Sequence, residues 1–260
     1  MSRSKLFSAV LSMLVLSVSG CELVSPASSP SMRRLVRILS DSADYSLYSY
    51  SGGKLSEMDI VRNLAVAYSI RYSYDGGNRP SSGLISEYGS DTTETLEKFH
   101  YDATLRLDSM DVLLKDRTGN FSMNEHLYYS YDAQGRVIRW IAYDPQYRTI
   151  YFTVELSYDS EGDVVRRVYY TPEGYTETST MSYDDELNPL YDMRQWLMEN
   201  PAVSRHNEIS SITVYSGGIR PTSEVNYAYT YDSNGYPVSS SVTGTQWNQT
   251  IKYGTTYEYQ

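Results

Sequence analysis

Hydrophobic and polar residues alternate with a period of two over much of the chain. From Tyr227 to Tyr231, tyrosine occupies every second position, and the small residues Ala228 and Thr230 lie between the rings. Successive side chains of a β-strand point to opposite faces of a sheet. The pattern therefore predicts a strand that carries three rings on one face.

A tyrosine-rich phrase returns along the chain at a nearly constant spacing. Its copies end at residues 51, 75, 102, 132, 159, 184 and 232, so consecutive copies are 24 to 30 residues apart, except for one step of 48 that equals two units. A repeat of this length indicates an array of one supersecondary unit.

Residues typical of turns follow several copies. Aspartate opens and glycine closes the four-residue segments 132–135, 159–162 and 232–235. Such an aspartate accepts hydrogen bonds from the amides of its own turn, and the glycine adopts a backbone with φ above zero, which we expect at Gly135 and Gly162. Each copy is therefore predicted to end one strand of a hairpin. A period of about 26 residues accommodates two strands and two turns.

One segment has the spacing of a helix instead. Asn188 is a suitable cap, Pro189 fits a first helical turn, and Asn200-Pro201 ends the pattern. Between them, apolar residues recur three and four positions apart, namely Leu190, Met193, Trp196 and Leu197. The predicted fold is all-β: an antiparallel meander of repeated hairpins that forms a curved sheet of about 14–18 strands, with one short helix near residues 189–199.

The N-terminus predicts export and anchoring. Residues 1–20 read as a signal peptide, because Arg3 and Lys5 precede an apolar stretch too short to span a bilayer. Its end, Val18-Ser19-Gly20-Cys21, resembles the lipobox of bacterial lipoproteins, which implies lipid attachment at Cys21. The alternative is an ordinary secretory signal followed by an incidental thiol. Residues 21–31 are rich in Ser and Pro and predict a flexible tether, so residues 32–260 form the single repeat-built domain.

The segment 129–137, Tyr-Ser-Tyr-Asp-Ala-Gln-Gly-Arg-Val, resembles the Tyr-Asp repeat of Rhs-type proteins, Tyr-x-Tyr-Asp-x-x-Gly-Arg-Leu. Other copies depart from it: Asp163 and Tyr236 stand where Arg is usual, and Leu187 where Gly is usual. Together with the lipobox and tether, the chain is similar to a family of outer-membrane lipoproteins with Tyr-Asp-like repeats from Gram-negative gut anaerobes. The resemblance implies an outer-membrane location, on the periplasmic or the cell-surface face, and no catalytic residue.

Composition narrows the partners. The net charge of −10 argues against nucleic acid, since phosphate binding depends on clustered Lys and Arg. The chain has 28 tyrosines and only 4 phenylalanines, so its aromatic residues have polar tips suited to half-wet surfaces. The expected partner is the membrane, through the lipid, together with a glycan or an envelope protein.

The sequence nominates no catalytic group. His100, His126 and His206 lack a second ligand at zinc spacing, and the acidic turns lack the spacing of an EF-hand, so we expect no metal and no cofactor. There is no Gly-x-Ser-x-Gly motif for a nucleophilic serine. A carboxylate pair for glycoside hydrolysis stays open, because any two of 32 acidic residues can meet in space.

Aromatic residues are the remaining candidates for ligand contact. Tyr227, Tyr229 and Tyr231 can form an exposed row, and Trp247 with Asn248 offers a ring and an amide suited to a sugar. The alternative is that these rings pack the sheet. We expect a non-catalytic, membrane-anchored binding module for glycan or peptide. A structural component of an envelope complex is the second hypothesis and an envelope hydrolase a remote third.

Overall fold

The computed structural model describes residues 33–40, 43–89, 92–194, 203–216 and 220–260. The predicted signal peptide, Cys21 and the tether lie outside the described residues. The strands are β1 (Leu35–Leu39), β2 (Tyr45–Ser51), β3 (Lys54–Arg62), β4 (Ala65–Tyr74), β5 (Pro80–Glu87), β6 (Thr93–Tyr101), β7 (Leu107–Lys115), β8 (Phe121–Tyr131), β9 (Val137–Asp144), β10 (Thr149–Tyr158), β11 (Val164–Tyr170), β12 (Thr176–Leu187), β13 (His206–Ser216), β14 (Ser223–Tyr231), β15 (Pro237–Gln246) and β16 (Gln249–Tyr259).

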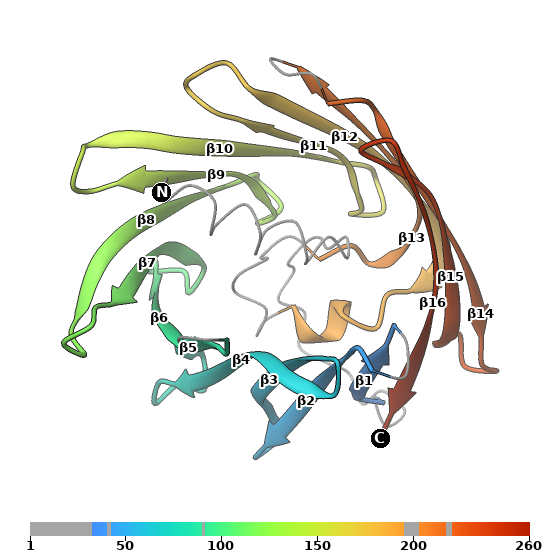
Figure 1. The fold of residues 1–260 in the computed structure, drawn as a ribbon, viewed down its shortest axis with the longest axis horizontal. Coiled ribbons are helices and arrows are strands. Elements are labelled where there is room, and N and C mark those ends of the chain that lie inside the picture. Colours follow the sequence, from blue (N-terminus) through green and yellow to red (C-terminus); the bar gives the residue numbers. More distant parts are fainter. Residues whose placement is uncertain (1–32, 41–42, 90–91, 195–202, 217–219) are drawn as a thin grey trace.

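The strands form one closed barrel (Figure 1). Each strand pairs antiparallel with its neighbours in sequence, and β1 closes the ring against β16 through pairs such as Arg37↔Glu258. The all-β antiparallel prediction is confirmed, and the sixteen described strands lie within the expected range. The predicted curved sheet is in fact closed into a barrel. Pairing of β1 with β16 satisfies the backbone groups that the two edge strands of an open sheet would expose.

The predicted helix near residues 189–199 is not found where the structure describes the chain. Residues Tyr191–Met193 form a single 3₁₀ turn, η1, and residues 195–202 lie outside the described part. Asn188 Oδ1 accepts a hydrogen bond from the Leu190 amide at 2.9 Å in the turn before η1, but the N-cap position of η1 is Leu190, which has no side-chain cap bond. Leu190 and Met193 pack into a hydrophobic cluster with residues of β1 to β5 and β16, so tertiary packing outweighs the helical spacing of the apolar residues. Figure 1 shows the segment that follows β12 inside the ring of strands.

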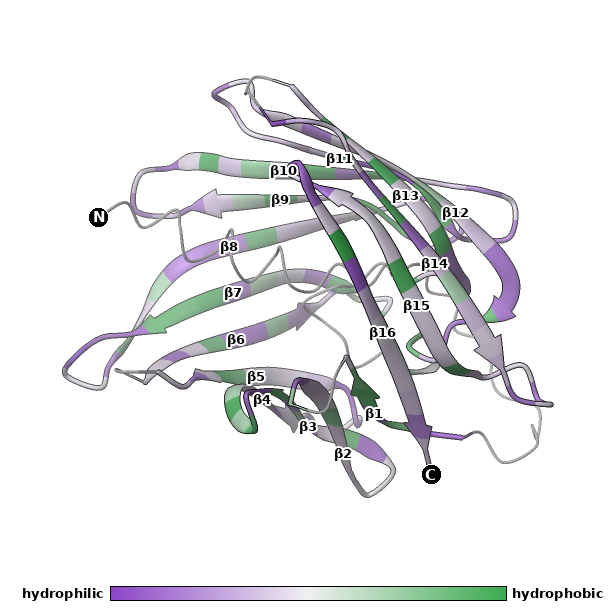
Figure 2. Cartoon of the chain, turned by 45° about the vertical axis from the view of Figure 1, so that its right-hand side comes forward, coloured by the Kyte–Doolittle hydropathy of each residue, from purple (hydrophilic) through white to green (hydrophobic). Residues whose placement is uncertain are grey.

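The outer face of the wall exposes many charged and polar residues, and the inner face carries most of the buried aromatic and aliphatic residues, together with buried acids such as Glu97 and Glu125. In β14, Val225, Tyr227 and Tyr229 are half-buried on the inner face, whereas Glu224 and Asn226 are exposed on the outer face. Figure 2 shows short hydrophobic and hydrophilic bands following one another along the strands. Exposed outer positions of other strands are Ser49, Arg71, Lys98, Ser130, Glu155, Thr180, Thr243 and Glu258.

Two hydrophobic clusters fill the interior. One joins β1 to β5, β16 and the β12–β13 connection and includes Tyr48, Met58 and Leu190. The other joins β6 to β11 and includes Phe99, Leu127 and Val154. The inward position of these residues explains why the period of two is so regular along the chain.

The Tyr-Asp turns share one end of the barrel, which we call the Tyr-Asp end. In the turn after β8, Asp132 Oδ1 accepts hydrogen bonds from the amides of Gln134 (3.0 Å) and Arg136 (2.8 Å), and its Oδ2 binds Arg136 Nε at 2.7 Å. Gly135 and Gly162 have φ values of 82° and 96°, so their predicted left-handed backbone is confirmed. The sequence motif is thus a turn with its own carboxylate cap.

Tyrosine hydroxyls join neighbouring hairpins at this end. The β7–β8 ladder ends at Ser109↔Tyr128, and Tyr131, three residues further, donates its hydroxyl to the carbonyl of Leu107 at 2.6 Å. The side chain thereby spans a gap that the backbone ladder leaves open. The same bond recurs from Tyr50 to Leu35, Tyr74 to Leu55, Tyr101 to Pro80, Tyr158 to Val137, Tyr183 to Val164 and Tyr259 to Pro237.

Over the residues described, no helix is long and apolar enough to cross a membrane.

Candidate functional site

The predicted tyrosine row lies on the inner face of β14. The rings of Tyr227 and Tyr229 stack with centroids 6.4 Å apart, and those of Tyr229 and Tyr231 lie 6.0 Å apart. Tyr257 of β16 and Leu190 of the β12–β13 connection line a small cavity together with Tyr229. Burial raises the pKa of Tyr229 above its ordinary value, chiefly by desolvation. The row is therefore covered from inside the barrel.

Trp247 and Asn248 lie at the other end of the barrel from the Tyr-Asp turns, which we call the far end. They form the two-residue turn between β15 and β16. Tyr227 pairs with Val242, so Trp247 is five residues further along β15, roughly 17 Å at the rise of a strand. The five residues nominated for ligand contact therefore do not meet in one site, and their role in binding stays a prediction.

Trp247 instead meets residues that the sequence did not nominate. Arg220 lies between two rings, with its guanidinium carbon 5.5 Å from the centre of Trp247 and 5.8 Å from that of Tyr175. Arg220 Nη1 donates to the Tyr175 hydroxyl at 3.3 Å and lies 3.8 Å from Glu177 Oε1. The Tyr175 hydroxyl donates to the same Glu177 oxygen at 2.6 Å. We call Tyr175, Glu177, Arg220 and Trp247 the far-end cluster.

The far-end cluster continues into the barrel through aromatic contacts. Tyr169 of β11 lies 6.3 Å from Tyr175 and 5.2 Å from Phe152, measured between ring centroids. Burial, together with the nearby carboxylate of Glu177, raises the pKa of Tyr169 to about 12. Sequence reasoning missed Tyr175, Glu177 and Arg220 because they approach Trp247 only when the neighbouring hairpins β11–β12, β13–β14 and β15–β16 pair side by side. One signal in the sequence could have pointed to this cluster: Trp247 is a bulky aromatic residue at a two-residue turn.

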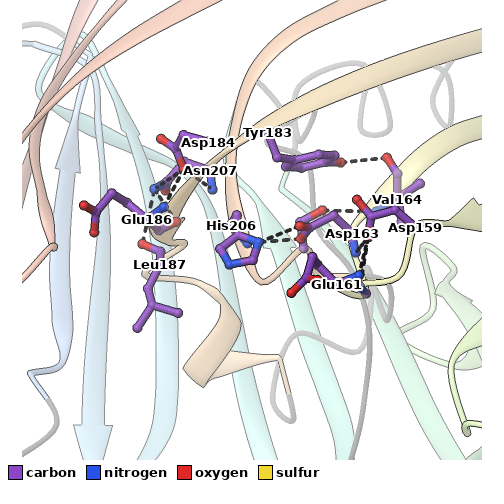
Figure 3. A network of polar contacts seen from close by, with 12 residues as sticks. Asp159, Glu161, Asp163, Val164, Tyr183, Asp184, Glu186, Leu187, His206 and Asn207 are labelled. Carbon is purple, nitrogen blue, oxygen red and sulfur yellow. Dashed lines mark hydrogen bonds and ion pairs between the residues drawn. The ribbon is translucent and has the colours of Figure 1, made fainter.

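An acidic cavity of about 510 Å³ opens at the Tyr-Asp end (Figure 3). Asp163, which replaces the usual Arg of the repeat, is buried there and binds His206: its Oδ1 accepts from the His206 amide at 3.1 Å, and its Oδ2 is 2.6 Å from the ring Nδ1. Asp159 Oδ1 accepts amide hydrogen bonds from Glu161, Gly162 and Asp163. These carboxylates hold the β10–β11 turn and the start of β13.

Two further acidic residues lie next to each other inside the far end. The β8–β9 register pairs His126 with Tyr143, which places Glu125 opposite Asp144 on the inner face. Burial and the Asp144 charge raise the pKa of Glu125 to about 7. Burial acts to raise the pKa of Asp144 as well, but hydrogen bonds from the Tyr151 hydroxyl and two turn amides hold it below its ordinary range. Asp144 is thus occupied as a turn cap.

The histidines each have a carboxylate partner. His100 and His126 flank Asp111 on the outer wall, with His100 Nε2 at 2.9 Å from Asp111 Oδ2, and His206 is held by Asp163. In the described ranges, no group of three His, Cys, Asp or Glu side chains has the arrangement of a metal site. Adjacent strands thus bring acidic residues that are distant in the sequence beside each histidine.

Comparison with known proteins gives a fold relationship. No family model matches the chain, and no curated protein resembles it in sequence. The crystal structure of a porin-like protein from Bacteroides uniformis is similar, with a TM-score of 0.54 and 13% identity over 87% of this chain and 95% of that one. A porin-like protein from Bacteroides vulgatus gives a TM-score of 0.44 at 12% identity, covering 88% of this chain and 99% of that one. At such identity the first match shows a shared fold alone.

Proposed function

We propose that the chain is a lipid-anchored, non-catalytic binding barrel of the outer membrane, held outside the bilayer by lipid on Cys21. The observation that carries this proposal is the polarity of the wall. A transmembrane barrel presents an apolar band to lipid and a polar lumen, and charged residues on its lipid face are destabilising. This barrel instead exposes the charged residues Arg71, Lys98 and Glu155 on its outer face, although Tyr128, Ile212 and Val214 are exposed there too.

The path of the chain supports an anchor at the Tyr-Asp end. Arg33 forms an ion pair with Asp232 of the last Tyr-Asp turn, and the Arg34 amide donates to the Gln260 carbonyl at 3.0 Å. A lipid attached through a tether of about ten residues then holds the Tyr-Asp end toward the membrane. The far end, with its cluster of aromatic and charged side chains, points away from the membrane and is the binding surface.

The geometry favours binding over the two other hypotheses. A hydrolase needs a paired carboxylate that is available to substrate, whereas Asp144 beside Glu125 is already bonded to Tyr151 and to its own turn. An assembly component was expected to offer a free sheet edge or a large apolar patch. All sixteen described strands are paired on both sides, so the described barrel offers no free sheet edge, and its exposed outer apolar residues include Tyr128 of β8 and Ile212 and Val214 of β13.

Membrane fractionation and conductance test this proposal. Wild type should sediment with outer membranes, and Cys21→Ser should become soluble while keeping the thermal stability of the wild-type barrel. Neither protein should produce ion conductance in planar lipid bilayers. Membrane retention of Cys21→Ser, or stepwise conductance by purified protein, would contradict the proposal and favour a barrel that spans the membrane.

A further inference from the structure

The Trp247-Asn248 turn is built from residues that such a turn does not favour. Trp247 and Asn248 have φ values of 51° and 65°, the left-handed pair that defines the tight hairpin turn usually made by Asn-Gly. Asparagine tolerates this conformation, whereas a bulky aromatic residue is uncommon there. The Trp247 ring is nevertheless 45% exposed. The strained turn therefore presents an aromatic ring whose exposed part is available for contact.

The far-end cluster holds this ring in place with one positive and one negative side chain. Arg220 lies over Trp247 and Tyr175, and Tyr175 is fixed in turn by its hydrogen bond to Glu177. The single positive charge of Arg220 is 3.8 Å from the single negative charge of Glu177, so the two charges balance. An aromatic face next to balanced polar groups suits an uncharged ligand that offers hydroxyl groups and apolar C–H faces.

Amide residues flank the turn that carries the ring. Gln246 and Gln249 are register partners that flank the turn, and Asn248 is part of it. Each amide supplies two donors and one acceptor oxygen, and each can therefore bond the adjacent hydroxyls of a sugar ring. A shallow, half-exposed ring bordered by planar amides differs from the deep apolar pocket that a peptide anchor side chain requires.

We propose that the far-end cluster is a binding site for a neutral glycan, in which a pyranose ring stacks on Trp247 while Arg220, Asn248 and the flanking glutamines bond its hydroxyls. This inference rests on the proposed binding function and names its ligand class. The overall net charge of −10 disfavours acidic polysaccharides, which leaves neutral glycans as the better match.

Affinity electrophoresis of the full-length lipidated protein in detergent tests the site. The probes are soluble xylan, glucomannan, mixed-linkage β-glucan and polygalacturonate in the gel. At least one of the three neutral polysaccharides should retard wild type. Trp247→Asn should weaken that retardation at least tenfold, because it removes the ring while keeping a residue that tolerates the turn. Arg220→Gln should weaken it several-fold.

Tyr147→Asn is the matched control. Tyr147 is an aromatic residue of the β9–β10 turn at the same end, it is 67% exposed, and it lies outside the far-end cluster. This variant should migrate like wild type, and all variants should share the wild-type melting temperature. Retardation by no neutral polysaccharide, or equal retardation of wild type and Trp247→Asn, would overturn the site. Retardation by polygalacturonate alone, lost in Arg220→Gln, would overturn its neutral specificity. Membrane fractionation is independent of both outcomes.

Discussion

Tyrosine is used in this barrel for its hydroxyl as much as for its ring. At the Tyr-Asp end, each bridging hydroxyl bonds a carbonyl of the neighbouring strand, and in several copies a cation from the preceding Tyr-Asp turn lies over the ring, as Arg106 does over Tyr131 at 4.9 Å. Phenylalanine supplies the ring but leaves the carbonyl without this donor. This need explains why tyrosines outnumber phenylalanines 28 to 4.

The Tyr131→Phe substitution isolates one such bond. It should lower the free energy of unfolding by about 1 kcal/mol, because the Leu107 carbonyl loses its donor while the ring packing stays. Urea denaturation measures the effect. Tyr128→Phe is the control, since Tyr128 is 50% exposed on the outer wall and should change stability by less than about 0.5 kcal/mol. Equal effects of the two changes would show that the hydroxyl bridge contributes nothing.

Glu125 should make the barrel sensitive to neutral pH. Burial and Asp144 raise the pKa of Glu125 to about 7, so the folded protein holds a proton that the unfolded chain releases near pH 4.5. Stability from this group is complete below pH 4.5 and declines as the pH rises toward 7. Glu125→Gln should therefore stabilise the protein at pH 8 by on the order of 2 kcal/mol and have little effect at pH 4. Denaturation at the two pH values decides, and a pH-independent difference would contradict the argument.

Hairpins were predictable from the sequence because each is local. The Asp-x-x-Gly spacing specifies the turn within five residues, as the bonds of Asp132 show. Closure was not predictable, since it depends on Arg37 meeting Glu258 across the whole chain. The far-end cluster was not predictable from the sequence either, because Tyr175, Arg220 and Trp247 come from three separate connections. The helical spacing of apolar residues in segment 189–199 predicted a helix wrongly, because Leu190 and Met193 contribute to the hydrophobic packing inside the barrel.

Gly244 tests the packing of two neighbouring strands. A Cβ atom at this position of β15 would lie 2.0 Å from the backbone oxygen of Glu224 in β14, so the strands must separate to admit it. Gly244→Ala should destabilise by about 2 kcal/mol or more, as overpacking does. Gly254→Ala is the matched control in β16, where the nearest atom is 3.7 Å away, and it should be nearly neutral. Thermal melts of both variants measure the difference, and equal melting temperatures would refute the close approach.

At the scale of the whole molecule, the turns make stability depend on acid pH. Hydrogen bonds from backbone amides and neighbouring side chains hold the pKa values of four turn aspartates below their ordinary range, at Asp75, Asp102, Asp116 and Asp232. Their contribution is present above the unfolded pKa of about 3.9 and is lost as the pH falls through the lower folded values. Because Glu125 acts in the opposite direction at higher pH, maximum stability is expected near pH 5.

A series of thermal melts from pH 2 to pH 8 checks this expectation. The melting temperature should fall below about pH 4 and decline more gently above about pH 5. Asp102→Asn should reduce the fall in melting temperature at acid pH, since the amide keeps an acceptor oxygen but carries no charge. The decline of the melting temperature above about pH 5 should be unchanged in this variant. A melting temperature that is constant from pH 2 to pH 4 would show that the turn carboxylates are not linked to folding.

The repeated bridge from tyrosine to carbonyl also bears on how such chains diversify. Most strands that end in a Tyr-Asp turn are joined to the preceding strand by the same side-chain bond, the exception being β14, where the Tyr231 hydroxyl donates to Asp184; a duplicated segment of two strands therefore brings both halves of such a junction. Insertion of one more unit then leaves every existing junction intact and only widens the ring. Because the diameter of a barrel grows with its strand number, adding such units would widen the lumen while reusing the same contact.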